Sequence, residues 1–288
     1  MELLEGIWFV PFVAGIMVLT NLVNSRGYLI PIYNFLQSKI KSKRLLIALI
    51  SGISGVLPIP GRTIISAGAL DTLAPNDGRR KNYGVINYLS THHYYLWSPL
   101  EATVLIPLSV LGLSYFEFIS MIAPLLVTLI GITLYYIFFV LKEDDVVIKK
   151  IEHQQKKVSP FKNFKWDVVL LVAAVILVGN AIKMNSDTIV DFLMSFNSGI
   201  FLAGVISFVT SFILGSSSKF AGITTLLVSM FGLNYLPLLF SLGYAGYLIS
   251  PTHKCLIITK TYFNLDMSLY RILLIISTAL VTVAYLSV

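Results

Sequence analysis

Two long stretches of this chain, residues 119–141 and 272–288, contain no charged side chain. As α-helices, stretches of this length reach or nearly reach across the hydrocarbon core of a bilayer, which is about 30 Å thick. The chain is only 12% charged and 56% hydrophobic, whereas a soluble domain is about 25% charged. The apolar runs are continuous rather than alternating, which disfavours a β-barrel. The sequence therefore predicts an all-α membrane protein with several crossings.

The start of the chain and its composition argue against several other classes of protein. Glu2 and Glu5 stand where a signal peptide has basic residues, so we expect the first apolar segment to stay as a membrane helix. The single cysteine, Cys255, excludes an internal disulfide and a cysteine-based metal cluster. The net charge of +7 fits cytoplasmic loops, so no nucleic-acid partner is expected. Motifs of zinc proteases, P-loop proteins and serine hydrolases do not occur. We expect no enzyme activity and no cofactor.

Basic residues cluster at 39–44, at 79–81 and in the polar segment 142–165, which has seven lysines. Cytoplasmic loops carry an excess of Lys and Arg, so we place all three clusters inside the cell. The stretch 45–73 begins and ends beside these clusters and has a Pro/Gly-rich middle, which predicts a re-entrant hairpin. The other predicted segments are 7–23 inward, 28–40 at the interface, 84–113 outward, 114–141 inward, 168–183 outward, 197–231 as a second hairpin, 234–263 inward and 268–288 outward.

The second half of the chain repeats the plan of the first. Residues 95–99 read YLWSP and residues 247–251 read YLISP, at an offset of 152. Three crossings in each half make the second half inverted relative to the first. We therefore predict two inverted-topology repeats, 1–141 and 166–288, joined by a cytoplasmic basic linker at 142–165. Each repeat has a re-entrant hairpin and a discontinuous helix, with about six crossing helices in all and both termini outside. Such repeats are typical of secondary transporters, whose sites lie where the repeats meet.

The Ser-Pro pairs lie in the middle of the two longest segments. Proline removes a backbone donor and disfavours helix at the preceding residue, so we expect 84–113 and 234–263 to break there. The alternative is that the prolines only kink tilted helices. Helix N-termini favour anions, and unwound carbonyls and hydroxyls suit Na⁺. The predicted substrate-binding residues are Pro58, Pro60, Gly61, Arg62, Thr63, Ser98, Pro99, Ser216, Ser217, Ser218, Lys219, Ser250 and Pro251.

The charged and titratable residues near the predicted breaks have more than one interpretation. An ionised side chain deep in a bilayer is costly, so Arg62 either binds a substrate anion, pairs with Asp71 or Glu101, or extends to the interface. Lys219 is its loose counterpart in the second hairpin. Glu101 is a candidate proton or cation site, or else stabilises the start of a half-helix. His92 and His253 are candidates for the same coupling role, or buried structural histidines. No spacing matches a strong metal pattern, so no metal site is expected.

Three sequence segments resemble a known family. These are LPIPGRTIISAGALD (57–71), INYLSTHHYYLWSPLEATVLI (86–106) and SPTHKCLIITKTYF (250–263). They resemble the prokaryotic integral-membrane family called domain of unknown function 401, which is similar to the ion transporter superfamily of arsenite, citrate, gluconate and dicarboxylate permeases. The resemblance implies a scaffold and a transport domain, a prokaryotic plasma membrane, pairing into homodimers, and Asn87 as a further site residue. Family members tend to carry a small residue where this chain has Arg62.

The sequence and the resemblance together predict a secondary active transporter. We expect it to move a small anion, such as a carboxylate, by alternating access, coupled to Na⁺ or H⁺. The alternative is a non-transporting accessory subunit, or a degenerate or channel-like relative of such a permease. Compared with the family that it resembles, this chain is short, and we expect it to lack a helix or two before residue 7. This expectation favours the alternative.

Overall fold

The computed structural model describes residues 29–56, 62–71, 73–75, 77–142, 199–265 and 267–287, together with scattered positions within 10–18 and 166–178. Throughout these residues the regular structure is helical and no strand occurs. The predicted all-α fold class is therefore confirmed for the described part of the chain. The segments predicted at 7–23, 142–165 and 168–183 lie wholly or largely outside it, as do Pro58, Pro60 and Gly61.

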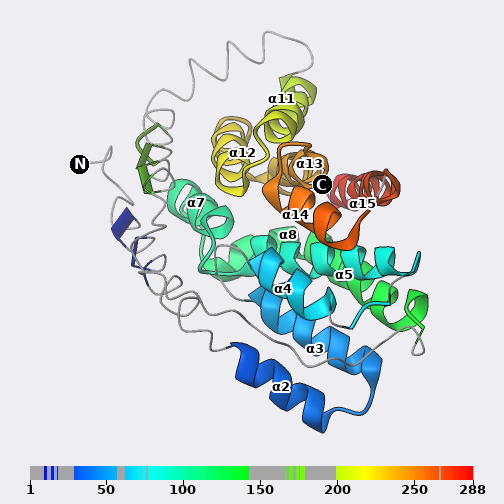
Figure 1. Cartoon of the computed structure of the whole chain (residues 1–288). Helices are drawn as coiled ribbons and strands as arrows, with labels where there is room; N and C mark the ends of the chain where they lie inside the picture. The colour runs from blue at the N-terminus through cyan, green and yellow to red at the C-terminus, as the bar shows by residue number, and fades with distance from the viewer. Residues whose placement is uncertain are drawn as a thin grey trace.

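The first half begins with α2 (Leu29–Lys39), which packs against α3 (Lys43–Val56) (Figure 1). Helix α3 and the following α4 (Arg62–Asp71) pack against each other, as expected for the hairpin predicted at 45–73. The segment predicted as a broken helix at 84–113 corresponds to three elements: α5 (Arg80–His92), which begins four residues earlier than predicted, the single turn α6 (Tyr94–Trp97) and α7 (Ala102–Leu111). The long α8 (Tyr115–Tyr135) continues into the π-helical turn η2 (Tyr136–Val140).

The second half has the same order of elements. Helices α11 (Gly199–Leu214) and α12 (Ser217–Phe231) form the predicted second hairpin, with the turn at residues 215–216. After the short 3-10 turn η4 (Leu233–Tyr235), the second broken helix consists of α13 (Leu236–Ile249) and α14 (Lys254–Phe263). Helix α15 (Ser268–Tyr285) follows and packs against both α13 and α8.

Helices α5 and α13 lie at the centre of the described structure. Every residue of α5 from Tyr83 to His92 is buried, and so are most residues of α13. A helix that is buried on all sides has neighbouring helices on every side. For both α5 and α13, a glycine allows one neighbouring helix to approach closely. A Cβ on Gly55 of α3 would overlap the carbonyl oxygen of Ser90, and one on Gly246 would overlap that of Phe208 in α11. Each hairpin therefore packs tightly against the central helix of its own half.

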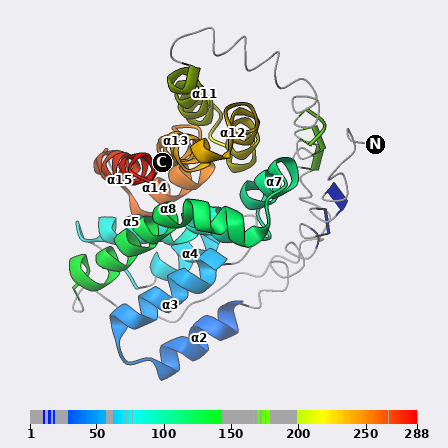
Figure 2. The same cartoon turned by 180° about the vertical axis from the view of Figure 1, so that it is seen from behind.

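The two halves also contact each other reciprocally. Helix α4 of the first hairpin packs against α14, and α12 of the second hairpin packs against α7 (Figures 1 and 2). Helices α7 and α14 have matching bounds, because an offset of 152 carries 102–111 onto 254–263. Both helices end in a left-handed residue, Gly112 with φ 68° and Asn264 with φ 49°. An offset of 152 thus relates the bounds of α7 and α14 and the left-handed residues that end them.

Two of the described helices are long and apolar enough to cross a membrane, Tyr115–Val140 and Ser268–Tyr285. The first begins with a capping box, in which the Ser114 hydroxyl accepts from the Glu117 N–H and the Glu117 carboxylate accepts from the Ser114 N–H. In the most apolar window of each helix only 28% and 33% of the residues are buried within the protein. Most of these two apolar surfaces therefore face away from the protein interior.

Candidate functional site

Arg62 is the first residue of α4, directly after the Pro/Gly-rich middle of the first hairpin. Its side chain is only 5% exposed, and its Nη1 lies 2.6 Å from Glu101 Oε1. The guanidinium carbon lies 4.1 Å from the centre of the Tyr95 ring and 4.6 Å from that of the Tyr94 ring. A carboxylate and two aromatic faces together offset the cost of burying this cation. Of the interpretations of Arg62, the structure contains the pair with Glu101.

The other predicted partner of Arg62, Asp71, is paired elsewhere. Its carboxylate accepts a hydrogen bond from Arg80, at the start of α5. Arg80 also lies over the ring of Phe263, which is the last residue of α14. These contacts tie the ends of α4, α5 and α14 together, away from Arg62. The Asp71 alternative for Arg62 is therefore wrong.

The first chain break lies at Ser98–Glu101, where the Ser-Pro pair predicts it. Ser98 and Glu101 both have extended backbone, with ψ angles of 125° and 138°. Side chains satisfy two carbonyl groups just before the break. Tyr115 Oη donates to the Trp97 carbonyl at 2.7 Å, and Thr103 Oγ1 donates to that of Tyr95. Because side-chain hydroxyls donate to these carbonyls in place of helical N–H groups, the buried helix can be interrupted without leaving the carbonyls unsatisfied.

The second chain break lies at Ser250–His253 and contacts the tip of the second hairpin. Ser250 is extended, with ψ 128°, and Thr252 Oγ1 donates to the carbonyl of Ile213 at 3.0 Å. Gly215, at the hairpin tip, has φ 54°, and a Cβ there would overlap Thr252 Oγ1. Each hairpin tip therefore meets one break: Arg62 meets the first, and Gly215 meets the second.

His92, the last residue of α5, contacts His253 of the second break, and their Nε2 atoms lie 3.3 Å apart in the protein interior. Around them are three tyrosine rings, those of Tyr88, Tyr95 and Tyr247. Tyr88 Oη donates to the Leu248 carbonyl at 2.6 Å and lies 2.9 Å from His253 Nδ1. Arg62 also lies over the Tyr95 ring. A continuous set of contacts therefore runs from the first hairpin tip through both breaks to the second tip.

Asn87 lies on α5, five residues before His92. Its Nδ2 donates to Thr259 Oγ1 of α14 at 3.0 Å. Its Oδ1 is buried and has no hydrogen bond within the described residues, and the same holds for Thr63 Oγ1 and Ser66 Oγ on α4. Helices α4, α5 and α14 pack against one another. Helices α4 and α5, which pack against each other, therefore carry buried side-chain oxygens that have no hydrogen bond within the described residues.

The predicted residues of the second hairpin contribute less than expected. Lys219 is exposed and does not reproduce the burial of Arg62. Ser218 is buried, and its hydroxyl lies 3.4 Å from that of Ser216, while Ser217 is partly exposed. Lys219 and Arg62 differ in exposure because they occupy different positions in their helices. Arg62 is the first residue of α4, whereas Lys219 is the third residue of α12, so their side chains leave the helix in different directions.

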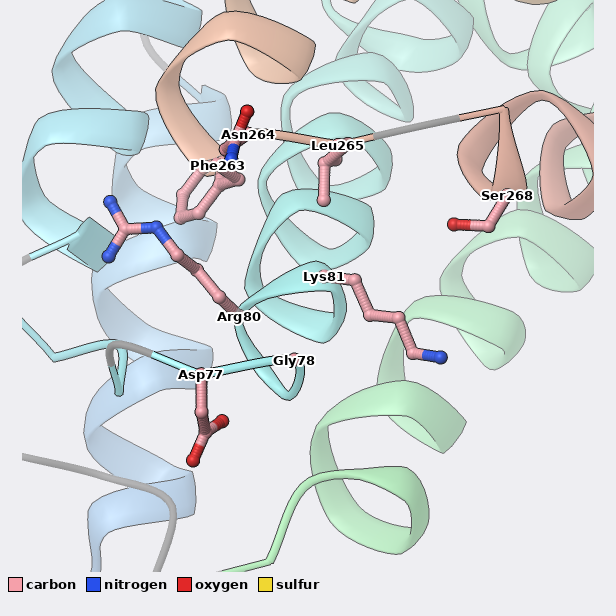
Figure 3. Close-up of a pocket in the computed structure, with 8 residues that line it drawn as sticks. All are labelled: Asp77, Gly78, Arg80, Lys81, Phe263, Asn264, Leu265 and Ser268. Carbon is pink, nitrogen blue, oxygen red and sulfur yellow. The ribbon is translucent and has the colours of Figure 1, made fainter.

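A cavity of about 660 Å³ lies away from the chain breaks, at the ends of α5, α14 and α15 (Figure 3). Figure 3 shows that its lining comes from the start of α5 and from the segment that links α14 to α15, namely from Asp77, Gly78, Arg80, Lys81, Phe263, Asn264, Leu265 and Ser268. Along helix α5 or α14 it is about 15–20 Å from the histidine pair, at 1.5 Å per residue. We regard it as a separate, basic recess rather than part of the site at the breaks.

The sequence interpretation missed four residues of this centre, Tyr88, Tyr95, Tyr247 and Cys255. The sulfur of Cys255 lies within 4.8 Å of a ring nitrogen of both His92 and His253. Tyr95 and Tyr247 begin the YLWSP and YLISP motifs, so the repeat itself could have identified them. Cys255 and Tyr88 carried no comparable signal, because they belong to different halves of the chain and only the fold brings them near the same histidines.

Comparison with known proteins identifies a family. Residues 16–153 match the sequence model of the family described as "Protein of unknown function (DUF401)", and this confirms the predicted family membership over that part of the chain. No curated protein and no solved structure matches the chain.

Proposed function

We propose that this chain, whose residues 16–153 match the model of the DUF401 family, is a secondary active transporter in the plasma membrane of a prokaryote. It moves a small anion, of which carboxylates are the first class to test, by alternating access with Na⁺ or H⁺. The observation that carries the proposal is the convergence of two hairpin tips and two broken helices on one buried centre. The proposed relation to the ion transporter superfamily rests on this arrangement.

The exposed surface supports placement in a membrane. Large apolar side chains are exposed along the outer helices, including Phe116 and Val127 on α8, Phe201 on α11 and Ile275 on α15. Soluble monomers rarely expose apolar patches of this extent. The apolar helices α8 and α15 also face outward over most of their surface. A multi-pass protein in contact with lipid tails accounts for both features.

Contacts between equivalent residues support the inverted repeat. At the offset of 152, Tyr95 corresponds to Tyr247, and their rings lie 5.5 Å apart. His92 corresponds to Tyr244, whose Oη donates to the His92 carbonyl at 2.9 Å. Equivalent residues meet each other only close to an axis that relates the two halves. A two-fold axis in the plane of the membrane gives inverted topology and places the site near the midplane.

The coupling cation fits the contact between α4, α5 and α14. Na⁺ takes oxygen ligands, and Asn87 on α5 and both Thr63 and Ser66 on α4 have buried side-chain oxygens without hydrogen bonds in the described structure. A cation bound at these helices would hold the first hairpin against the second broken helix. Binding of Na⁺ would thereby order the two segments that form the anion site.

The anion itself fits the starts of α7 and α14. Both helices begin at a break, and neither Glu101 nor His253 caps the helix with its side chain. Helix N-termini stabilise anions, and Ser98 and Ser250 supply hydroxyl groups beside them. Arg62 lies next to this position while paired with Glu101. Protonation of Glu101 would release the guanidinium for the anion, which is the route by which H⁺ coupling would operate.

The pairing of Arg62 also keeps the alternative function open. A buried cation with a purely structural role needs a partner of opposite charge, and Arg62 has one in Glu101. Its counterpart in the second hairpin, Lys219, is exposed. A non-transporting accessory subunit, or a degenerate or channel-like relative of a permease, would retain the same fold. Such a protein would bind no anion in a Na⁺-dependent manner.

The test is thermal unfolding of the purified chain against a panel of small anions, each with and without Na⁺. We expect one anion class to raise the melting temperature only in the presence of Na⁺, because a ligand stabilises the state that binds it. Asn87→Ala should abolish the Na⁺ dependence. Asn82→Ala, on the same helix but partly exposed, is the matched control and should leave it intact. If no anion stabilises the wild type, the accessory alternative replaces the transporter.

A further inference from the structure

We propose that His92, His253 and Cys255 form a binding site for a thiophilic transition-metal ion, with Zn²⁺ and Cu⁺ as the candidates. One ligand atom from each residue lies within 4.8 Å of the others. The two histidines are buried, and Cys255 is partly exposed. Imidazole and thiolate groups are the ligands that these metal ions prefer.

Hydrogen bonds assign the tautomer of both histidines. His92 Nδ1 contacts the Tyr88 carbonyl oxygen, and His253 Nδ1 lies 3.1 Å from the Tyr247 carbonyl oxygen. A carbonyl oxygen can only accept, so each Nδ1 carries the hydrogen and donates it. In a neutral imidazole the other nitrogen, Nε2, then has a lone pair and no hydrogen. Both Nε2 atoms are therefore ready to bind a cation.

These two Nε2 atoms face each other at 3.3 Å. Two lone pairs in this position repel unless they share a cation. Two imidazole nitrogens at about 2.05 Å from a tetrahedral metal lie about 3.3 Å apart, which is the separation in this structure. A linear two-coordinate arrangement would need about 4 Å from the same bond length. The geometry thus matches an ion with three or four ligands.

Cys255 supplies a third ligand of the right chemistry. At metal bonds of about 2.05 Å to nitrogen and 2.3 Å to sulfur, the sulfur would lie about 3.6 Å from each Nε2. The sulfur already lies within 4.8 Å of a ring nitrogen of each histidine, so only a small movement of the Cys255 side chain is needed. A proton shared by the two rings would need no sulfur, whereas a metal ion uses all three groups. The fourth position stays open to water or an anion, as in metal sites with three protein ligands.

The surroundings of the two rings also resemble those of metal-binding histidines. Such histidines donate their second ring N–H to a backbone carbonyl or another acceptor, which fixes the ring. Both rings do so in this protein, and Tyr88 Oη lies 2.9 Å from His253 Nδ1 as a second acceptor. The ligands come from α5 and from the start of α14. The metal would therefore bridge the two halves of the protein, beside the start of α14 where the anion is proposed to bind.

The test uses the purified full chain, reduced and freed of metal, and titrates it separately with Zn²⁺, Cu⁺ and Co²⁺. We expect one equivalent of metal to bind, and Co²⁺ to give a thiolate-to-metal charge-transfer band in the ultraviolet. Cys255 is the only cysteine, so the band reports this site alone. Competition with a chelator of known affinity then shows whether Zn²⁺ or Cu⁺ binds more tightly.

Variants separate the metal site from a purely structural cluster. Cys255→Ser should remove the Co²⁺ band, and Tyr88→Phe should weaken binding about 10- to 100-fold by loss of the second acceptor. His93→Gln is the control: His93 neighbours His92, but its Nδ1 accepts from Trp97 Nε1, and metal binding should be unchanged. Absence of the band in the wild type, or metal binding that survives Cys255→Ser combined with His253→Ala, would overturn the proposal. Neither result depends on transport.

Discussion

The Arg62–Glu101 pair gives the sharpest prediction for stability. Removing one partner of a buried ion pair costs about 3–5 kcal/mol, because the other charge stays buried. Glu101 is 17% exposed, so water can reach it and the lower end of that range applies. Arg62→Met also loses contacts with two aromatic faces, worth about 1 kcal/mol. We therefore expect Arg62→Met to destabilise by about 4 kcal/mol and Glu101→Gln by about 3 kcal/mol.

Thermal unfolding followed by tryptophan fluorescence measures these effects. At about 2 °C per kcal/mol, Arg62→Met should lower the melting temperature by about 8 °C. The double variant should be less destabilised than the sum of the single ones by about 2 kcal/mol, because removing both partners leaves no unpaired charge. Arg79→Met is the matched control. Its pair with Asp77 is about half exposed, and surface pairs contribute about 0–1 kcal/mol.

Additive effects would refute the argument, since they would mean that the two charges do not interact. So would an Arg62→Met variant that unfolds at the same temperature as Arg79→Met, because the arginine would then be solvated rather than buried. Either result would also return Arg62 to the candidates for direct anion binding, with its charge uncompensated.

Two further predictions concern the hairpin tip and the topology. Gly215→Ala should lower the free energy of unfolding by about 2 kcal/mol more than Gly112→Ala does, as measured by thermal unfolding. Both residues have positive φ, but only at position 215 would a Cβ meet other atoms within 4 Å. Equal losses of stability would contradict the contact between the hairpin tip and the second break. In a variant without Cys255, a cysteine introduced at His153 should react with an impermeant thiol reagent only from the cytoplasmic side, and one at Ser186 only from outside; the reverse pattern would contradict the predicted orientation.

The chain breaks could be predicted from the sequence because local chemistry determines them. Proline at 99 and 251 removes a helical hydrogen bond whatever surrounds it, and the structure has extended backbone at Ser98 and Ser250. The bounds of two other helices also lie close to those predicted. The predicted interfacial segment 28–40 corresponds to α2 at Leu29–Lys39, and 268–288 corresponds to α15 at Ser268–Tyr285.

The partners of the buried polar residues were harder to predict, because they depend on tertiary packing. The sequence allowed Arg62 to form an ion pair with either Asp71 or Glu101, and the folded structure has the pair with Glu101. Lys219 matched Arg62 by a loose alignment, but two residues of helical phase turn it outward. The sequence indicated His92 and His253 separately. It could not show that their Nε2 atoms face each other beside Cys255.

Gradient-driven accumulation in proteoliposomes tests the central claim most directly. The anion that stabilises the purified chain is supplied only outside the vesicles, and an inward Na⁺ or H⁺ gradient is imposed. The account predicts that the anion rises inside above its external concentration, that the accumulation collapses when the gradient is dissipated, and that Asn87→Ala loses the Na⁺-driven part. Equilibration without accumulation would show a channel, and no flux at all would show a non-transporting subunit. Either outcome would contradict the proposed transporter.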